Sequence, residues 1–257
     1  MITMGRVSAK KGFTLIELLV VIAIIALLLS VIMPALGKAK KAAKSLVCRS
    51  QLRQMQLAST MYNQANDGDM YWYDAYASGT VWISNMEPFI GDTDAVRYCP
   101  STKVDPDQGG SSKYAWHWGE EAGSYAINGY IYKDNENDVL ANFWPPGEFE
   151  AHAYQSLDTV TNSGNTPTFF DCAWLDRWPK DTDEIDALHD LDDPRNTATS
   201  HMSLMMMNRH GKAGNVSFVD GHAEAVELSD FWSLKWHRKF EIKHDMKRRD
   251  DSPIYQP

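Results

Sequence analysis

A long apolar run close to the N-terminus constrains this chain more than any other feature of the sequence. Between Leu18 and Met33 the one polar side chain is Ser30, and the wider apolar stretch covers residues 13–36. As an α-helix the shorter segment would rise about 24 Å and the wider one about 36 Å. The hydrocarbon core of a bilayer is about 30 Å thick, so this segment can span it. The core helix of a soluble domain normally carries a polar face, and this segment has none.

A secretory signal peptide is the alternative that also combines a basic start with an apolar run. Such a peptide needs small residues at a cleavage site after the run. Residues 35–37 read Ala-Leu-Gly, which is a poor version of that site, and the helix-forming pattern continues past them. The glycine Gly12 instead lies immediately before the run, so the sequence favours an anchor that stays on the mature chain.

The residues that lead into the run form an ordered motif, because residues 11–17 read Lys-Gly-Phe-Thr-Leu-Ile-Glu. The carboxylate of Glu17 is costly at the start of a membrane helix unless a cation at the same depth pairs with it. Cleavage after Gly12 would create a new amino group on Phe13, and a neighbouring copy of the chain could supply that cation.

This motif resembles the cleavage and methylation site of type IV pilins and type II secretion pseudopilins. In that family a prepilin peptidase cuts after the glycine and methylates the new N-terminus, and the glutamate pairs with a neighbour's N-terminus during assembly. The resemblance implies these roles for Gly12, Phe13 and Glu17. Pro34 falls where many of these proteins carry a proline that bends the helix.

The basic residues around the apolar run bear on its orientation. Three precede it, and six follow it closely: Lys38, Lys40, Lys41, Lys44, Arg49 and Arg53. The positive-inside rule alone would favour the reverse of the pilin orientation. We give precedence to the motif, because a prepilin peptidase site must face the cytoplasm. The expected location is therefore the inner membrane, with a single pass, a cytoplasmic N-terminus and a head outside the cytoplasm.

The rest of the chain predicts an α+β, pilin-like fold: a long N-terminal helix packed on a mainly antiparallel β head. We expect a leader at 1–12, a transmembrane and assembly helix at 13–36, a stalk helix at 37–65 and an extracytoplasmic head at 66–257. In the stalk, apolar residues at steps of three and four can pack on the head. Within the head, residues 125–132 and 168–174 read as strands.

The C-terminal region predicts a β-hairpin, because residues 214–219 alternate and Asp220-Gly221 is a strong turn signal. His210, separated from Asp220 by nine residues, completes a resemblance to the H-X9-DG signature of pseudopilin-like proteins. A hydrolase could instead use His210, Asp220 and His222 as metal ligands or as an acid–base set. We favour a structural role in which His210 donates to Asp220 or to a backbone carbonyl.

The three cysteines include no C-x-x-C pair, so no structural zinc site is predicted. A disulfide can form outside the cytoplasm. We predict that Cys48 pairs with Cys99 and that Cys172 is a buried free thiol.

Charge and aromatic content limit the remaining functions. The net charge of −9 argues against nucleic acid as a partner. Residues 181–193 hold seven acids without the glycine and final glutamate of an EF-hand, so we expect no cofactor, with calcium as the alternative. Tryptophans more often fill cores than bind sugars. The candidates for a sugar-binding surface are Trp72, Trp82, Trp116, Trp118, Trp144, Trp174 and Trp178.

The sequence therefore predicts a structural subunit, not an enzyme, of a type II secretion or type IV pilus-like envelope filament. Its expected partners are prepilin peptidase, copies of itself, other pseudopilins and an inner-membrane assembly platform. The alternative is a membrane-tethered envelope domain that acts as a polysaccharide-binding adhesin or a metal-dependent hydrolase.

Overall fold

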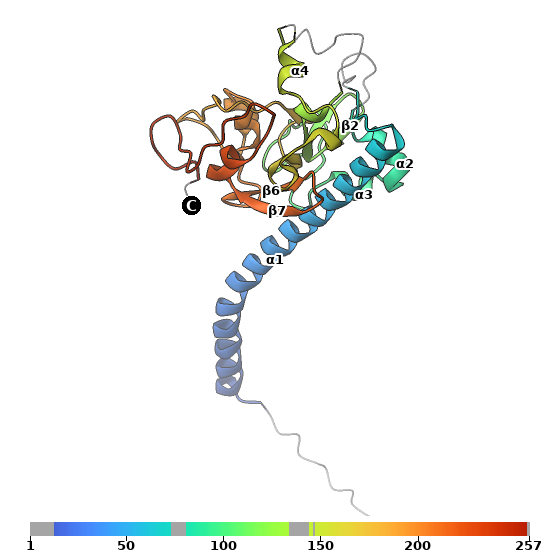
Figure 1. Cartoon of the computed structure of the whole chain (residues 1–257). Helices are drawn as coiled ribbons and strands as arrows, with labels where there is room; N and C mark the ends of the chain where they lie inside the picture. The colour runs from blue at the N-terminus through green and yellow to red at the C-terminus, as the bar shows by residue number, and fades with distance from the viewer. Residues whose placement is uncertain (1–12, 73–80, 134–143, 146, 256–257) are drawn as a thin grey trace, which may run out of the picture. The chain divides into compact units, whose positions relative to one another are not determined.

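Figure 1 shows the computed structural model of the chain, which describes residues 13–72, 81–133, 144–145 and 147–255. The predicted leader, with Gly12, lies outside the described residues. The chain divides into two compact units, residues 1–43 and 44–257.

One helix dominates the N-terminal part of the chain. Helix α1 runs from Leu15 to Ala65 and continues through Pro34 without interruption, which confirms the predicted long helix. Its N-terminal part is long and apolar enough to cross a membrane, and none of that segment is buried within the protein. Leu15 is 81% exposed and Val31 is 70% exposed. A contiguous apolar surface of this kind marks contact with lipid or with other chains.

The C-terminal end of α1 belongs to the second unit and has one buried face. Cys48, Leu52, Met55 and Ser59 follow one another at steps of three and four residues and are all buried. Residues at this spacing lie on the same side of a helix, so this face packs against the head. The helix ends before Gly68, which adopts a φ of +88° in the turn that follows.

The head contains a five-stranded sheet in the order β5-β3-β4-β6-β7. Every neighbouring pair is antiparallel except β3 and β5, which are parallel. A separate antiparallel pair joins β1 to β2. The mainly antiparallel α+β head predicted from the sequence is therefore confirmed. The strands are β1 Trp116–Trp118, β2 Glu121–Gly123, β3 Tyr125–Asn128, β4 Pro167–Asp171, β5 Asp176–Arg177, β6 Ala213–Phe218 and β7 Ala223–Glu227.

Short helices connect these strands. The α-helical segments are α2 Glu87–Ile90, α3 Asp94–Arg97, α4 Glu148–His152 and α5 Pro194–Thr197. A 3₁₀ helix, η7 Leu228–Ser233, follows the last hairpin.

The central strand β4 separates two hydrophobic cores. Successive side chains on a strand point to opposite faces. Phe169 packs in the core that includes Leu52 of α1, whereas Phe170 packs in the core that includes Trp236. The strand ends at Asp171, earlier than the sequence predicted. Cys172 N still donates to the Ser124 carbonyl, next to the last β3–β4 pair, but Ala173 N donates to the carbonyl of Leu204, which lies outside the sheet.

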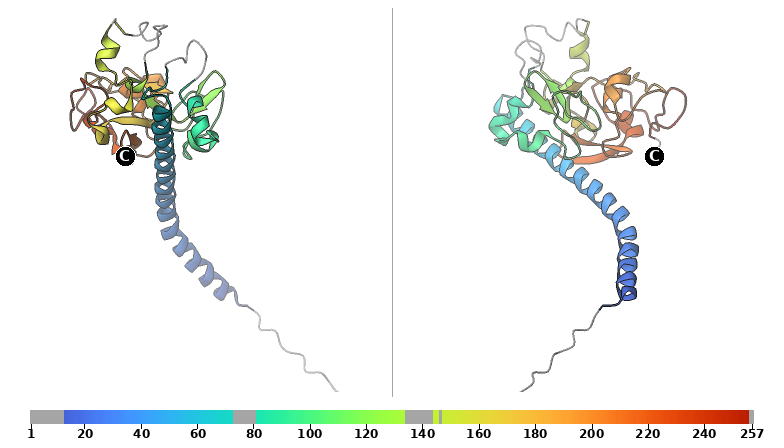
Figure 2. Two further views of the ribbon diagram at one scale, coloured as in Figure 1. Left: turned by 45° about the vertical axis from the view of Figure 1, so that its right-hand side comes forward. Right: turned by 180° about the vertical axis from the view of Figure 1, so that it is seen from behind.

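The β6–β7 hairpin lies beside the second-unit part of α1, as Figure 2 shows from two further sides. Ser45 Oγ donates to Asn215 Oδ1 at 2.9 Å, and Gln56 Nε2 donates to the Val219 carbonyl at 3.2 Å. These contacts hold β6 and the start of its turn against α1, next to the candidate site.

Candidate functional site

The start of α1 holds the predicted processing and assembly residues. Phe13 is exposed, and Thr14 caps the helix. Glu17 N donates to Thr14 Oγ1 at 3.2 Å, and Thr14 N donates back to Glu17 Oε2 at 2.8 Å. This reciprocal pair is a capping box. Sequence reasoning overlooked it, although a threonine followed three residues later by a glutamate is its signature.

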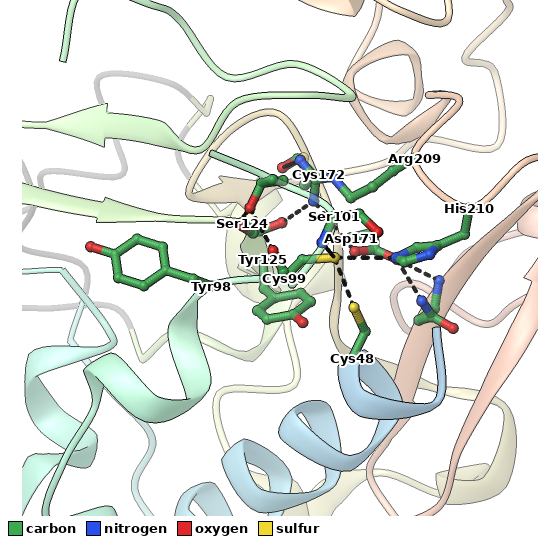
Figure 3. Close-up of polar contacts among 12 residues, drawn as sticks. Cys48, Tyr98, Cys99, Ser101, Ser124, Tyr125, Asp171, Cys172, Arg209 and His210 are labelled. Atoms are coloured by element: carbon green, nitrogen blue, oxygen red, sulfur yellow. Dashed lines mark hydrogen bonds and ion pairs between the residues drawn. The ribbon is translucent and has the colours of Figure 1, made fainter. Parts of the chain in front are cut away.

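A second polar cluster is buried where β4 ends. Both side chains of the Asp171–Arg209 ion pair are 1% exposed, and Arg209 Nη1 lies 3.3 Å from Asp171 Oδ1. The other oxygen, Asp171 Oδ2, accepts from the backbone N of Asn215 at 2.8 Å and from its Nδ2 at 3.1 Å. The carboxylate is therefore held from two directions (Figure 3).

Arg209 also binds three backbone carbonyls. Its Nη1 donates to the carbonyl of Ser124, and its Nη2 donates to those of Ser111 at 2.8 Å and Cys172 at 3.3 Å. One guanidinium thus joins the loop before β1, the start of β3 and the end of β4. The sequence analysis did not identify Arg209 or Asp171 as site residues.

His210 extends this cluster to two cysteines (Figure 3). Its Nε2 lies 3.3 Å from Cys99 Sγ and 3.6 Å from Asp171 Oδ2. Cys99 Sγ lies 2.7 Å from Cys48 Sγ, which comes from the buried face of α1. The donor atoms of Cys48, Cys99 and His210 all lie within 4.8 Å of one another.

The charges in the cluster act on its titratable groups. Burial lowers the pKa of the His210 imidazole, but the Asp171 carboxylate and the hydrogen bond with Cys99 raise it above its ordinary value. Burial raises the pKa of the Cys99 thiol, but the hydrogen bonds with Cys48 and His210 outweigh this effect and lower it to about 5. Cys99 is therefore the thiol of this pair that ionises first.

The predicted contact of His210 with Asp220 is wrong, whereas donation of His210 to a backbone carbonyl stays a prediction. Asp220 and Gly221 form the β6–β7 turn, whereas His210 precedes the other end of β6, and a six-residue strand spans about 20 Å. Gly221 has a φ of +96°, and Asp220 Oδ1 accepts from His222 N at 3.1 Å. The structure therefore does not bring His210, Asp220 and His222 together as the hydrolase alternative requires.

Replacement of His210 by Ala tests whether its buried contacts stabilise the head. We expect the free energy of unfolding to fall by about 1–3 kcal/mol, because Cys99 and Asp171 lose a hydrogen-bonding neighbour in a buried site. Denaturant unfolding of the full-length protein in detergent measures the change. His244→Ala is the matched control, since His244 is exposed and should shift stability by less than about 0.5 kcal/mol. Equal effects of the two variants would contradict a role for the buried cluster.

Several carboxylates of the acidic segment 181–193 form ion pairs or accept hydrogen bonds from other residues of the chain. Glu184 and Asp186 pair with Arg249, and Asp190 Oδ1 accepts from Asp192 N. Asp183 Oδ2 accepts from the backbone of Lys180 and Met202. Calcium binding here stays a prediction.

Most of the candidate sugar-binding tryptophans belong to the core. Trp82, Trp116, Trp144 and Trp178 are buried. Trp118 and Trp174 are partly buried and pack edge to face, with ring centroids 5.7 Å apart. Of the seven candidate tryptophans, Trp72 is the one whose side chain is largely exposed, at 45%.

Comparison with known protein families supports the reading of the N-terminus. Residues 7–33 match the prokaryotic N-terminal methylation motif, which is typical of type IV pilins and pseudopilins. No curated protein and no solved structure gives a significant match. The motif, the long helix α1 and the mainly antiparallel head together define a pilin-like architecture. The resemblance to the H-X9-DG signature stays a prediction from the sequence.

Proposed function

We propose that this chain is a structural subunit of a type II secretion or type IV pilus-like envelope filament. The observation that carries the proposal is the match of residues 7–33 to the methylation motif, which leads directly into the exposed apolar part of α1. A helix with lipid-compatible side chains on every face can anchor one subunit and then pack against its neighbours in a filament.

The proposal assigns a place and partners to each part of the chain. Residues 13–36 anchor the protein in the inner membrane, the N-terminus faces the cytoplasm, and the head lies outside. Prepilin peptidase removes residues 1–12. An inner-membrane assembly platform then adds the subunit to copies of itself and to other pseudopilins. The buried tryptophans and the separation of His210 from Asp220 support this structural role over a sugar-binding or hydrolytic one.

Processing provides the direct test of the proposal. We expect the mature protein from its native host to begin at Phe13, with a methylated amino group, because Gly12 precedes the apolar run. Mass spectrometry of the N-terminal peptide measures both features. Gly12→Leu is the control variant, and it should retain residues 1–12 while still entering the membrane. An intact N-terminus on the wild type, or a cut near Gly37, would contradict the proposal.

A further inference from the structure

We propose that a disulfide bond joins Cys48 to Cys99, and that His210 is the positioning residue that makes Cys99 the first sulfur to react. The inference rests on the proposed function, because it needs the head to fold outside the cytoplasm, where disulfides persist. It gives His210 a chemical role that is separate from the hairpin.

The positions of the two sulfurs support a covalent bond. Cys48 comes from the buried face of α1 and Cys99 from the chain just after α3, 51 residues later. Both are buried, and their Sγ atoms are 2.7 Å apart. Two thiolates on one tetrahedral zinc ion would lie about 3.8 Å apart, whereas a disulfide needs about 2.05 Å. Both cysteines are free thiols in this structure, and their sulfurs lie closer together than a shared zinc ion would hold them.

The surrounding charges also favour a disulfide over a metal ion. Asp171, whose Oδ2 lies 3.6 Å from His210 Nε2, could complete a four-ligand site, but both of its oxygens already accept hydrogen bonds from Arg209 and Asn215. The guanidinium of Arg209 lies in the same buried cluster and would repel a divalent cation. A disulfide is neutral, so its formation leaves the Asp171–Arg209 pair balanced.

The position of His210 identifies the sulfur that reacts first. The titratable and charged groups that face Cys99 are Cys48 on α1, Asp171 on β4, Tyr125 on β3, and Arg209 and His210 before β6. The backbone N of Ser101 also donates to Cys99 Sγ at 3.4 Å. Among the titratable groups, His210 can take the thiol proton and remain as an imidazolium between the Cys99 thiolate and Asp171. Such a pair holds a cysteine in its thiolate form at neutral pH.

The reaction needs an external oxidant that contains a disulfide, either a protein thiol oxidant or a small molecule such as oxidised glutathione. Cys99 is buried in the folded head, so the head must first open locally around it. The Cys99 thiolate then attacks one sulfur of that disulfide, forms a mixed disulfide and releases the first thiolate. Cys48 then attacks Cys99 and releases the second thiolate, and the two protons from Cys48 and Cys99 pass to the two leaving sulfurs. Two thiols of the protein are oxidised, and one disulfide of the oxidant is reduced to two thiols.

Peptide mapping under non-reducing conditions tests the bond itself. In full-length protein from the native envelope, we expect the peptides with Cys48 and Cys99 to be linked and Cys172 to be alkylated only after unfolding. In detergent, Cys48→Ser and a reducing agent should each lower the melting temperature by about 10 °C, because the closed loop is long. The reducing agent should have no further effect on Cys48→Ser, and Cys172→Ser should keep the linked peptides. A link to Cys172, two free thiols or one bound metal ion per chain would overturn the inference.

The pH dependence of oxidation tests the role of His210. The reduced full-length protein is mixed with oxidised glutathione in detergent, and linked peptides are followed with time. His210→Gln should slow formation by about tenfold at pH 6 and much less at pH 9, where thiolates form without help. His244→Gln is the matched control and should follow the wild type at both pH values. An equal slowing of His210→Gln at both pH values would show a packing role alone and overturn the assignment.

The two proposals fail in different ways. Filaments assembled from subunits with free Cys48 and Cys99 would end the disulfide proposal and leave the filament function in place. If Cys48 and Cys99 are linked but the protein never assembles into filaments, the filament function fails and the disulfide proposal stands.

Discussion

Glu17→Ala is expected to enter the membrane and to be cleaved after Gly12 like the wild type, yet to form few filaments. In a filament the carboxylate would lie against the charged amine of a neighbour's Phe13, in a medium where an unpaired charge is costly. Removal of Glu17 leaves that amine unmatched at every interface, so we expect filament yield to fall about tenfold or more. Membrane fractionation beside electron microscopy of filaments measures both properties.

Glu17 could instead matter because it completes the capping box with Thr14. Further variants separate this role from pairing with the amine of a neighbour's Phe13. Glu17→Gln keeps an oxygen that can accept from Thr14 N but removes the charge. Thr14→Val removes the hydroxyl that accepts from Glu17 N and keeps the carboxylate. Charge pairing predicts loss of filaments for Glu17→Gln and near-normal yield for Thr14→Val. Glu17→Asp should be intermediate, because its carboxylate is one methylene shorter. If Thr14→Val loses filaments and Glu17→Gln keeps a near-normal yield, the main role of Glu17 is in the helix cap.

The features that the sequence predicted correctly are encoded by neighbouring residues. The apolar run specifies a long exposed helix because its length and its apolar residues on every face suffice without tertiary contacts. The Asp220-Gly221 turn is likewise local, and the alternating residues on either side pair as β6 and β7. The Thr14–Glu17 capping box is equally local and could have been read from its spacing.

The buried cluster could not be read in this way, because its members come from distant parts of the chain. Pairing of β4 with β6 brings Asp171 to Asn215, and packing of α1 brings Cys48 to Cys99. The sequence predicted that Cys48 pairs with Cys99, which stays a prediction, and it linked His210 to the wrong carboxylate. Asp220 is nearer in sequence, whereas Asp171 is nearer in the fold. A hairpin explained Asp220-Gly221 fully, so it gave no information about the partner of the histidine.

The Asp171–Arg209 pair carries the largest expected effect on the stability of the head. Arg209→Met would leave a buried carboxylate without its cation and would remove one donor from each of three carbonyls, of which that of Ser124 still accepts from Cys172 N. Breaking one side of a buried pair costs about 3–5 kcal/mol of unfolding free energy. Arg249→Ala is the control, because its pair with Glu184 is more than half exposed and should contribute roughly 0–1 kcal/mol.

A double variant shows whether the unpaired charge or the lost hydrogen bonds account for most of the fall in unfolding free energy. Asp171→Asn removes the charge and keeps an oxygen that can accept from Asn215 N. If the unpaired charge is the main cost, adding Asp171→Asn to Arg209→Met should restore part of the lost stability, because the neutral amide no longer needs a cation. If the carbonyls of Ser111, Ser124 and Cys172 dominate, the double variant should be no more stable than Arg209→Met. Denaturant unfolding of the full-length variants in detergent measures this coupling, with Arg209→Lys as the milder variant where Met prevents folding. A stability for Arg209→Met within about 1 kcal/mol of the wild type would contradict the importance of the pair.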